Sequence, residues 1–270
     1  MMLQQVKVGI RGAGDLATGV AVRLWRSGFQ VIMTEIDRPL TVRRRVAFSE
    51  AVFAGAVRVE DVIARRANDA AEAGHMLTRN QIPVLVDPQA ETLKQLSPDV
   101  LVDGIMAKRN LGAGLEDAPL VIGLGPGFTA GLDVHAVIET KRGHFLGRVL
   151  WEGQAEADTG IPGAVMGYTG QRIVRAPGSG PFQSRLEIGA LVQEGDLLGY
   201  VEAHPVPAPL TGVLRGLIHD GVEVRPGMKI GDVDPRGNQD ACRTISDKAL
   251  AIGGGVLEAI LAWLSGRQRL

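Results

Sequence analysis

Apolar residues in the first hundred positions occur in short runs separated by stretches with helical spacing. Residues 6–11 and 29–35 are apolar runs of strand length, and between them the apolar positions of residues 16–27 recur at helical intervals. Further runs at 82–86 and 100–105 enclose a second helical stretch at 88–96. This alternation predicts a doubly wound α/β sheet that begins with a right-handed βαβ unit.

The pattern changes after about residue 120, where apolar segments are short and interrupted by glycine. We expect strands at 119–123, 134–140 and 145–150, and helical spacing returns only near the end of the chain. There, three consecutive glycines at 253–255 precede an apolar helix at 256–264, which is expected to pack back on the body of the protein. The 36 glycines of the chain indicate many tight turns and close backbone approaches.

An internal repeat lies between residues 176 and 235. The segments 188–199 and 220–231 each place a valine three residues before a glycine and a second glycine four residues later. With Ala208-Pro209 between them, they resemble the two half-motifs of biotinyl/lipoyl-type sandwich domains. In such domains a lysine in the hairpin before the Ala-Pro segment carries the prosthetic group, whereas residues 202–207 contain no lysine. We therefore predict this fold without the covalent modification.

Three regions follow from these patterns. We expect a Rossmann-like nucleotide-binding domain over residues 1–150, a β-rich barrel-sandwich-like domain over 151–236, and a C-terminal segment with its helix over 237–270. With 270 residues and 45% hydrophobic content, the chain has enough apolar material for a large core, which excludes a disordered protein.

The charge and the cysteine content limit the possible binding partners and indicate the cellular compartment. A formal net charge of −1 offers no broad basic surface for nucleic acid or anionic lipid, and no apolar run approaches the roughly 18 residues of a membrane span. The single Cys242 excludes an internal disulfide, and the first residues lack signal-peptide features, so we expect a cytoplasmic protein. The basic run at 43–45 is either a solvated helix face or a phosphate contact beside a nucleotide loop.

The strongest local motif is Gly12-x-Gly14-x-x-Ala17, placed between a predicted strand and a predicted helix, with Glu35 ending the next strand. This arrangement is the dinucleotide-binding fingerprint. Gly12 allows the tight turn, and Gly14 lets the backbone of the loop and of Asp15 approach a pyrophosphate. Glu35 is expected to accept hydrogen bonds from ribose hydroxyls and to repel a 2′-phosphate. The alternative is a degenerate fold that keeps the turn for packing.

A second glycine-rich loop follows the strand expected at 119–123. Its amides and its hydroxyl suit an anion, so it is either a structural turn or a second phosphate-holding loop. The candidate binding residues are Gly125, Gly127, Thr129 and Gly131. Leu132 follows the last glycine, where a Walker loop requires a lysine, which disfavours ATP hydrolysis of that type.

Two further groups of residues carry possible chemistry. His135 and Glu139 can share one face of an extended strand, but no obvious third ligand accompanies them, so we predict no metal site. Cys242 lies near Arg243 and Lys248 in the sequence and is either a plain packing thiol or, as the only thiol available, a carrier of selenium in a mixed Se–S species. This second, catalytic role requires a thiol that is partly exposed and largely ionised near neutral pH.

Several longer sequence motifs distinguish the chain from a generic dehydrogenase. They are IRGAGDLATGV at 10–20, GLGPGFTAG at 123–131, HAVIETKRGH at 135–144, KIGDVDPR at 229–236 and ISDKA at 245–249. Over residues 6–262 the chain resembles the YqeB family, an accessory protein of selenium-dependent molybdenum hydroxylase systems. The resemblance implies a client enzyme similar to xanthine dehydrogenase, whose molybdenum site carries a labile selenium. It does not imply a defined reaction.

These observations lead to one main hypothesis and two alternatives. The main hypothesis is a maturation factor that binds a nucleotide-bearing ligand, for which molybdopterin cytosine dinucleotide is the leading candidate, and helps its insertion or selenylation in a molybdenum hydroxylase. The first alternative is an NAD-dependent oxidoreductase that uses the same loop, although no proton-donor set beyond His135 is recognisable. The second is a docking scaffold without catalysis. The sequence leaves open whether the protein is an enzyme and whether it forms a homo-oligomer.

Overall fold

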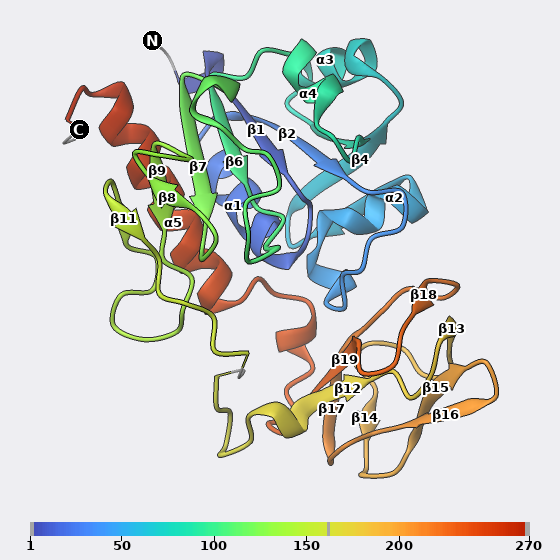
Figure 1. The fold of residues 1–270 in the computed structure, drawn as a ribbon. Coiled ribbons are helices and arrows are strands. Elements are labelled where there is room, and N and C mark those ends of the chain that lie inside the picture. Colours follow the sequence, from blue (N-terminus) through green and yellow to red (C-terminus); the bar gives the residue numbers. More distant parts are fainter. Residues whose placement is uncertain (1–2, 161–162, 268–270) are drawn as a thin grey trace. The chain divides into compact units, whose positions relative to one another are not determined.

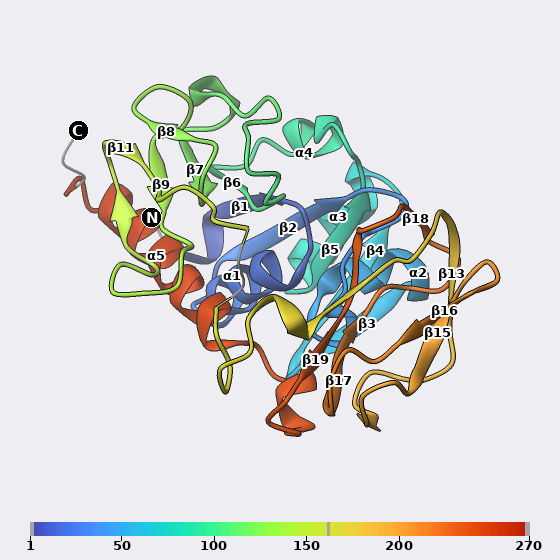
Figure 2. The same cartoon turned by 60° about the horizontal axis from the view of Figure 1, so that its bottom comes forward.

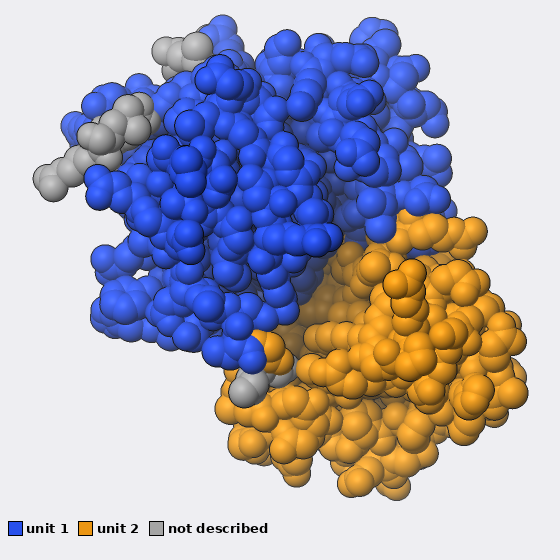
Figure 3. Space-filling model, in the orientation of Figure 1, with its two compact units in different colours: residues 1–37, 48–159, 245–270 blue, residues 38–47, 160–244 orange. Residues whose placement is uncertain are grey.

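The computed structural model describes residues 3–160 and 163–267 of the chain, which form two compact units (Figures 1 and 3). Unit 1 comprises residues Met1–Asp37, Phe48–Thr159 and Ile245–Leu270, and unit 2 comprises Arg38–Ala47 and Gly160–Thr244. The two units divide at residues 159/160 and 244/245, whereas the sequence led us to expect boundaries at 150 and 236, and unit 2 also includes the segment 38–47.

Within the described residues, unit 1 is built on a nine-stranded sheet of order β10-β9-β7-β6-β1-β2-β5-β4-β3. All neighbouring strands are parallel except the two edge pairs, β3 with β4 and β10 with β9. The strands are β1 (Lys7–Arg11), β2 (Gln30–Glu35), β3 (Ala56–Val59), β4 (Val62–Ala67), β5 (Ile82–Val86), β6 (Val100–Asp103), β7 (Leu120–Leu124), β9 (Ala136–Ile138) and β10 (Val149–Leu150). A small separate pair joins β8 (Thr129–Ala130) to β11 (Gly153–Gln154).

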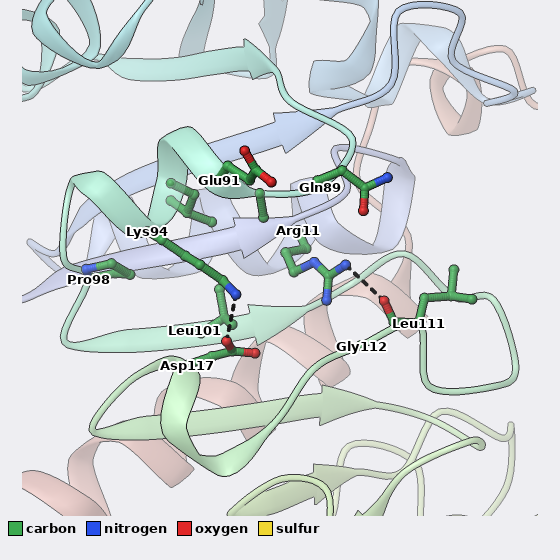
Figure 4. Close-up of a pocket in the computed structure, with 11 residues that line it drawn as sticks. Arg11, Gln89, Glu91, Lys94, Pro98, Leu101, Leu111, Gly112 and Asp117 are labelled. Carbon is green, nitrogen blue, oxygen red and sulfur yellow. Dashed lines mark hydrogen bonds and ion pairs between the residues drawn. The ribbon is translucent and has the colours of Figure 1, made fainter.

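Helices cover both faces of this sheet, which explains why β6 and β7 are buried along their whole length. The helices of unit 1 are α1 (Asp15–Arg26), α2 (Ala51–Ala54), α3 (Ala70–Thr78), α4 (Glu91–Gln95) and α5 (Asp247–Leu264). Short 3-10 turns occur at Leu3–Gln5, Phe48–Glu50 and Leu115–Asp117. Helix α4 packs on one face, where the Leu93 side chain fills the space beside Gly9, and α1 with α5 lies on the opposite face (Figure 4).

Helices α1 and α5 lie side by side, although they come from opposite ends of the chain (Figures 1 and 2). A Cβ atom at Gly19 would lie 2.6 Å from the Ala249 methyl, and one at Gly253 would lie 3.0 Å from the Gly19 carbonyl oxygen. Glycine at these positions therefore allows the two backbones to approach closely. This contact fixes the first turn of α5 near the first turn of α1.

Within its described residues, unit 2 contains two four-stranded antiparallel sheets, β12-β19-β17-β14 and β16-β15-β13-β18. The strands are β12 (Ile173–Arg175), β13 (Gly180–Ser184), β14 (Leu191–Val192), β15 (Leu197–Val201), β16 (His204–Pro207), β17 (Gly212–Leu217), β18 (Glu223–Val224) and β19 (Lys229–Asp234), with 3-10 turns at Arg44–Val46, Gly170–Arg172 and Asp240–Cys242.

The internal repeat of the sequence corresponds to two equivalent strand-turn-strand segments of unit 2. Val192 and Val224 are buried, and the glycines three residues later, Gly195 and Gly227, both have positive φ in the turn. One repeat runs from β14 to β15 and the other from β18 to β19, so each crosses from one sheet to the other.

The basic run at 43–45 fits neither interpretation offered by its sequence. Arg43 is buried and donates to the carbonyl oxygens of Ala241 and Thr244 at 3.1 and 3.4 Å. Arg44 Nε donates to the Leu217 carbonyl at 2.7 Å, and Arg45 pairs with Glu187 at 2.9 Å. These arginines therefore fasten the segment 38–47 onto unit 2. Among the described residues no helix combines the length and the apolar character needed to cross a membrane.

Candidate functional site

The carboxyl ends of the parallel strands in unit 1 gather several of the predicted residues at one edge of the sheet. Strand β1 lies between β2 and β6, and the chain leaves β1 through α1 on one face and leaves β6 through residues 104–119 toward β7. The strand order therefore reverses direction between β1 and β6. In open α/β sheets the crevice outside such a switch point is the usual place for a ligand.

The loop after β1 has the geometry that the fingerprint predicts. Gly12 has a φ of 88°, and a Cβ atom there would lie 3.1 Å from the Gly104 carbonyl oxygen, so only glycine fits. Gly14 is the N-cap of α1 in an extended conformation, and its carbonyl accepts from Thr18 N at 2.8 Å. Gly14 has no side chain that could accept hydrogen bonds from the first amides of α1. Because α1 begins at the carboxyl end of β1, these amides and the positive end of the helix dipole lie at the edge of the sheet. A Cβ atom at Gly104 would lie 3.1 Å from the Ala17 methyl, so small residues at both positions let α1 lie close to the end of β6.

Glu35 braces this loop from the end of β2. Its carboxylate accepts from Ala13 N and from Ile36 N, both at 2.9 Å. Burial raises the pKa of Glu35, against the effect of these two hydrogen bonds. The observed role of Glu35 is thus to hold the glycine loop, and a contact with ribose stays a prediction.

Sequence reasoning missed the role of Lys248, which it considered only as a neighbour of Cys242. Lys248 lies in the first turn of α5 and forms no hydrogen bond or ion pair with the described residues. Burial lowers its pKa, Arg142 lowers it further, and Asp15, Asp158 and Glu139 oppose the shift. A lysine in the first turn of a helix interacts unfavourably with the positive end of the helix dipole. This unfavourable position is the sequence signal that could have identified Lys248.

The other charged side chains around Lys248 already have partners within the protein. Arg142 makes a two-pronged ion pair with Asp247 at 2.7 and 2.8 Å, and Lys108 pairs with Asp158 at 2.5 Å. Buried Glu139 accepts from the backbone amides of Lys141 and Glu156, both at 2.7 Å. Lys248 is therefore the cation of this cluster that can bind an additional anion.

The second glycine loop is a packed turn. The amides of Gly125 and Gly131 donate to the carbonyls of Ile138 and Val134 at 2.9 and 2.8 Å. Thr129 N donates to Asp133 at 2.8 Å, and its hydroxyl accepts from Gln154 at 2.8 Å. Because these groups already have partners inside the protein, the contacts speak against the expected phosphate-holding role.

Gly127 in the same loop serves a close backbone contact. It has a φ of 108°, and a Cβ atom there would lie 2.5 Å from the backbone nitrogen of Arg109. Glycine at this position therefore lets the loop pack directly on the segment that follows β6.

The structure does not meet the conditions for a selenium carrier at Cys242. The residue is 1% exposed in unit 2, and its sulfur lies 3.9 Å from the Leu214 carbonyl oxygen. Burial raises the pKa of the thiol, although Arg215, Arg43 and Arg45 act in the opposite direction. Cys242 is thus a buried packing thiol, and the raised pKa disfavours its thiolate form.

His135 and Glu139 serve the backbone. His135 Nδ1 accepts from Val121 N at 2.9 Å, and burial lowers the pKa of the imidazole. Among the described residues no group of three or more histidine, cysteine, aspartate or glutamate side chains is placed to hold a metal ion.

Three solved structures show a distant similarity to the chain. TcdA (CsdL) is 13% identical over 49% of this chain and 53% of its own, with a TM-score of 0.29. A succinylglutamate desuccinylase from Silicibacter sp. TM1040 is 15% identical over 84% of both chains, with a TM-score of 0.25. An aspartoacylase family protein from Mesorhizobium loti is 12% identical over 84% of both chains, with a TM-score of 0.27. Scores this low carry no argument about function.

A comparison with curated sequences is far more specific. No family model matches the chain. However, 254 of its residues, 94% of the chain, align at 53% identity with YqeB of Escherichia coli (strain K12). The alignment covers 47% of that protein, so the chain spans about half the length of this relative. On this identity over nearly the whole chain, the protein belongs to the YqeB family.

Proposed function

We propose that unit 1 binds a nucleotide-bearing ligand whose phosphates lie at the N-terminus of α1. The observation that carries the proposal is the loop from Gly12 to Gly14, with its positive φ at Gly12 and an N-cap that has no side chain. A phosphate there accepts hydrogen bonds from the first amides of the helix, which have no acceptor within the helix itself.

The surrounding charges fit a phosphate at this position. Asp15 begins α1 and by itself repels an anion, but Lys248 lies within electrostatic reach of it and has no ion-pair partner among the described residues. A bound phosphate supplies a negative charge beside the half-buried ammonium group and so offsets its desolvation. Lys248 then provides a charge-assisted hydrogen bond that complements the backbone amides.

In the cell, we propose that this ligand is handled during maturation of a selenium-dependent molybdenum hydroxylase in the cytoplasm. The support for this role is the resemblance to the accessory proteins of such systems, which also makes molybdopterin cytosine dinucleotide the leading candidate ligand and the hydroxylase the leading partner. With Cys242 buried, the chain itself offers no exposed thiol among its described residues for selenium transfer. The role that fits these residues is binding and delivery of the cofactor.

We further propose that unit 2 is an unmodified barrel-sandwich domain of the biotinyl/lipoyl type. The supporting observation is the tight hairpin between β15 and β16, where Val201 pairs with His204 and residues 202–203 form the tip. Neither tip residue is a lysine, and Glu202 adopts a φ of 52°. We therefore expect no prosthetic group on this hairpin, which leaves the unit available as a binding module.

One calorimetric experiment separates the main proposal from its rivals. The purified protein is titrated with CTP, NADH, NADPH and the isolated molybdenum cofactor in its cytosine dinucleotide form. The proposal expects saturable binding of the cytosine nucleotides, with the complete cofactor the tightest. Preference for NADH over all the others would support an NAD-dependent oxidoreductase instead, and absence of binding by every compound would leave only a docking scaffold.

A further inference from the structure

A cavity of about 250 Å³ lies on the face of the nine-stranded sheet that α4 covers (Figure 4). Its walls come from α4 and the residues just before it, from β1 and β6, and from the segment 104–119 that follows β6. None of its lining residues belongs to the glycine loop or to α1, so it is separate from the proposed phosphate position. At roughly 30 Å³ for each water molecule, the cavity has room for about eight waters. It therefore suits a small molecule of amino-acid size and is too small for a nucleotide.

The lining of the cavity is mainly polar and carries charges of both signs. Its polar side chains are those of Arg11, Gln89, Glu91, Lys94 and Asp117. The two cations balance the two anions, so the formal charge of the lining is zero. A ligand that complements such a lining has polar groups of both signs and no net charge.

Arg11 offers a buried donor to this cavity. The residue is 6% exposed, and its guanidinium pairs with Asp103 at 3.1 Å and donates to the Leu111 carbonyl at 3.3 Å (Figure 4). Its Nε, however, has no hydrogen-bond partner among the described residues. A buried N–H group without an acceptor is unfavourable until a water or a ligand supplies one. Because a carboxylate is the acceptor that best suits a guanidinium, Arg11 favours a ligand that carries this group.

Glu91 is the anion of the lining that is available to a ligand. Lys94 and Asp117 already pair with each other at 3.0 Å. Asp87 caps the start of α4, where its carboxylate accepts from three backbone amides at 3.1, 2.8 and 3.2 Å, so these amides are not free for a ligand. The exposed carboxylate of Glu91 forms no hydrogen bond or ion pair with another described residue. It can therefore accept hydrogen bonds from an ammonium group.

We propose that this cavity binds a free α-amino acid, whose carboxylate accepts from Arg11 Nε and whose ammonium group donates to Glu91. A dicarboxylate would place its second negative charge beside Glu91. A diamine would leave Arg11 Nε without an acceptor. The zwitterion satisfies both groups and adds no net charge to a lining whose own charges cancel. This site goes beyond the nucleotide site proposed above and does not depend on it.

The test uses the standard amino acids as probes, titrated one by one into the full chain in a calorimeter. For each amino acid that binds, the carboxamide without the carboxylate and the N-acetyl derivative without the ammonium group serve as matched ligands. Gln89→Trp and Leu111→Trp fill the cavity from exposed lining positions, and Glu91→Gln removes the anion. Gln95→Trp places the same large side chain at an exposed position of α4 outside the lining and serves as the control. Circular dichroism and the thermal midpoint show whether each variant is folded.

We expect at least one amino acid to bind the wild-type protein, and both of its derivatives to bind at least about tenfold more weakly. Gln89→Trp, Leu111→Trp and Glu91→Gln should each weaken its binding, whereas Gln95→Trp should not change it. Absence of binding by every amino acid would overturn the proposal. Wild-type affinity in both folded tryptophan variants of the lining would overturn the location of the site, and equal affinity for the N-acetyl derivative would overturn the role of Glu91.

Discussion

Two adjacent glycines of α5 should respond in opposite directions to the same substitution. At Gly254 a Cβ atom meets nothing within 4 Å. At Gly255 a Cβ atom collides with the carbonyl oxygen of Gly147 and lies 3.0 Å from Ile138 Cγ2. Gly254→Ala and Gly255→Ala therefore have the same effect on the helical backbone but differ in their effect on packing.

The magnitudes follow from these two environments. Replacing glycine by alanine inside a helix stabilises it by about 0.8–1 kcal/mol, so Gly254→Ala should raise the free energy of unfolding by about that amount. Gly255→Ala gains the same increment, but a collision with a backbone carbonyl, which cannot move aside, costs about 2–3 kcal/mol, and we expect a net loss of about 1–2 kcal/mol. In a chain of this size each kcal/mol corresponds to about 2–4 °C in the midpoint of thermal unfolding.

Urea denaturation followed by circular dichroism measures both variants against the wild-type protein. The expected result is a higher midpoint for Gly254→Ala and a lower one for Gly255→Ala, with similar slopes. If both variants were stabilised equally, α5 would not pack against residue 147. The argument that places Lys248 beside the first turn of α1 would then lose its basis, because it depends on where α5 lies.

Three further predictions concern the thiol, the hairpin and the lysine. Cys242 should resist iodoacetamide at pH 8 in the native protein and react fully in urea, and fast native labelling would contradict its burial. Intact-mass spectrometry should give the sequence mass, whereas a biotinyl or lipoyl increment would show that a modified lysine exists despite the tip at 202–203. Lys248 has a pKa below its ordinary 10.5, so the native state binds fewer protons than the unfolded state and stability should rise with pH toward 10.5. Lys248→Met should therefore be more stable than wild type at pH 7, with a gap that narrows at alkaline pH, and a constant gap would refute this.

Local patterns were sufficient to predict the elements that contact the glycine loop. The strand at 6–11, the helix at 16–27 and the strand at 29–35 correspond to β1, α1 and β2 within one or two residues. Their signals are strong because buried parallel strands are continuously apolar and because the loop needs glycine at Gly12. The repeat in unit 2 was detectable for a similar reason, since equal turns impose equal glycine positions.

Elements that depend on distant partners were not predictable. The hairpin of β3 and β4 and the helix α3 were missed, although Asp69 caps α3 by accepting from Glu72 N at 2.8 Å, a local signal present in the sequence. The environment of Lys248 depends on packing between α1 and α5, which are separated by more than two hundred residues. Cys242 was considered near Arg243, but the cations that act on its thiol are Arg215, Arg43 and Arg45, which tertiary packing brings close.

The central claim, a phosphate at the N-terminus of α1, is tested most directly by substituting Gly14. An aspartate at an N-cap accepts hydrogen bonds from the first-turn amides, so Gly14→Asp should change stability by only a few tenths of a kcal/mol. Its carboxylate, however, occupies the phosphate position and repels an anion by about 4 kcal/mol at 4 Å in a surface environment. Gly14→Asn has nearly the same shape without the charge and serves as the control.

The measurement is a calorimetric titration of the three proteins with the nucleotide that binds the wild type most tightly among CTP, NADH and the molybdenum cofactor. We predict at least about a 100-fold loss of affinity for Gly14→Asp, a smaller loss for Gly14→Asn, and an unchanged fold by circular dichroism. Wild-type affinity in a folded Gly14→Asp protein would contradict the claim that the ligand's phosphate lies at this helix.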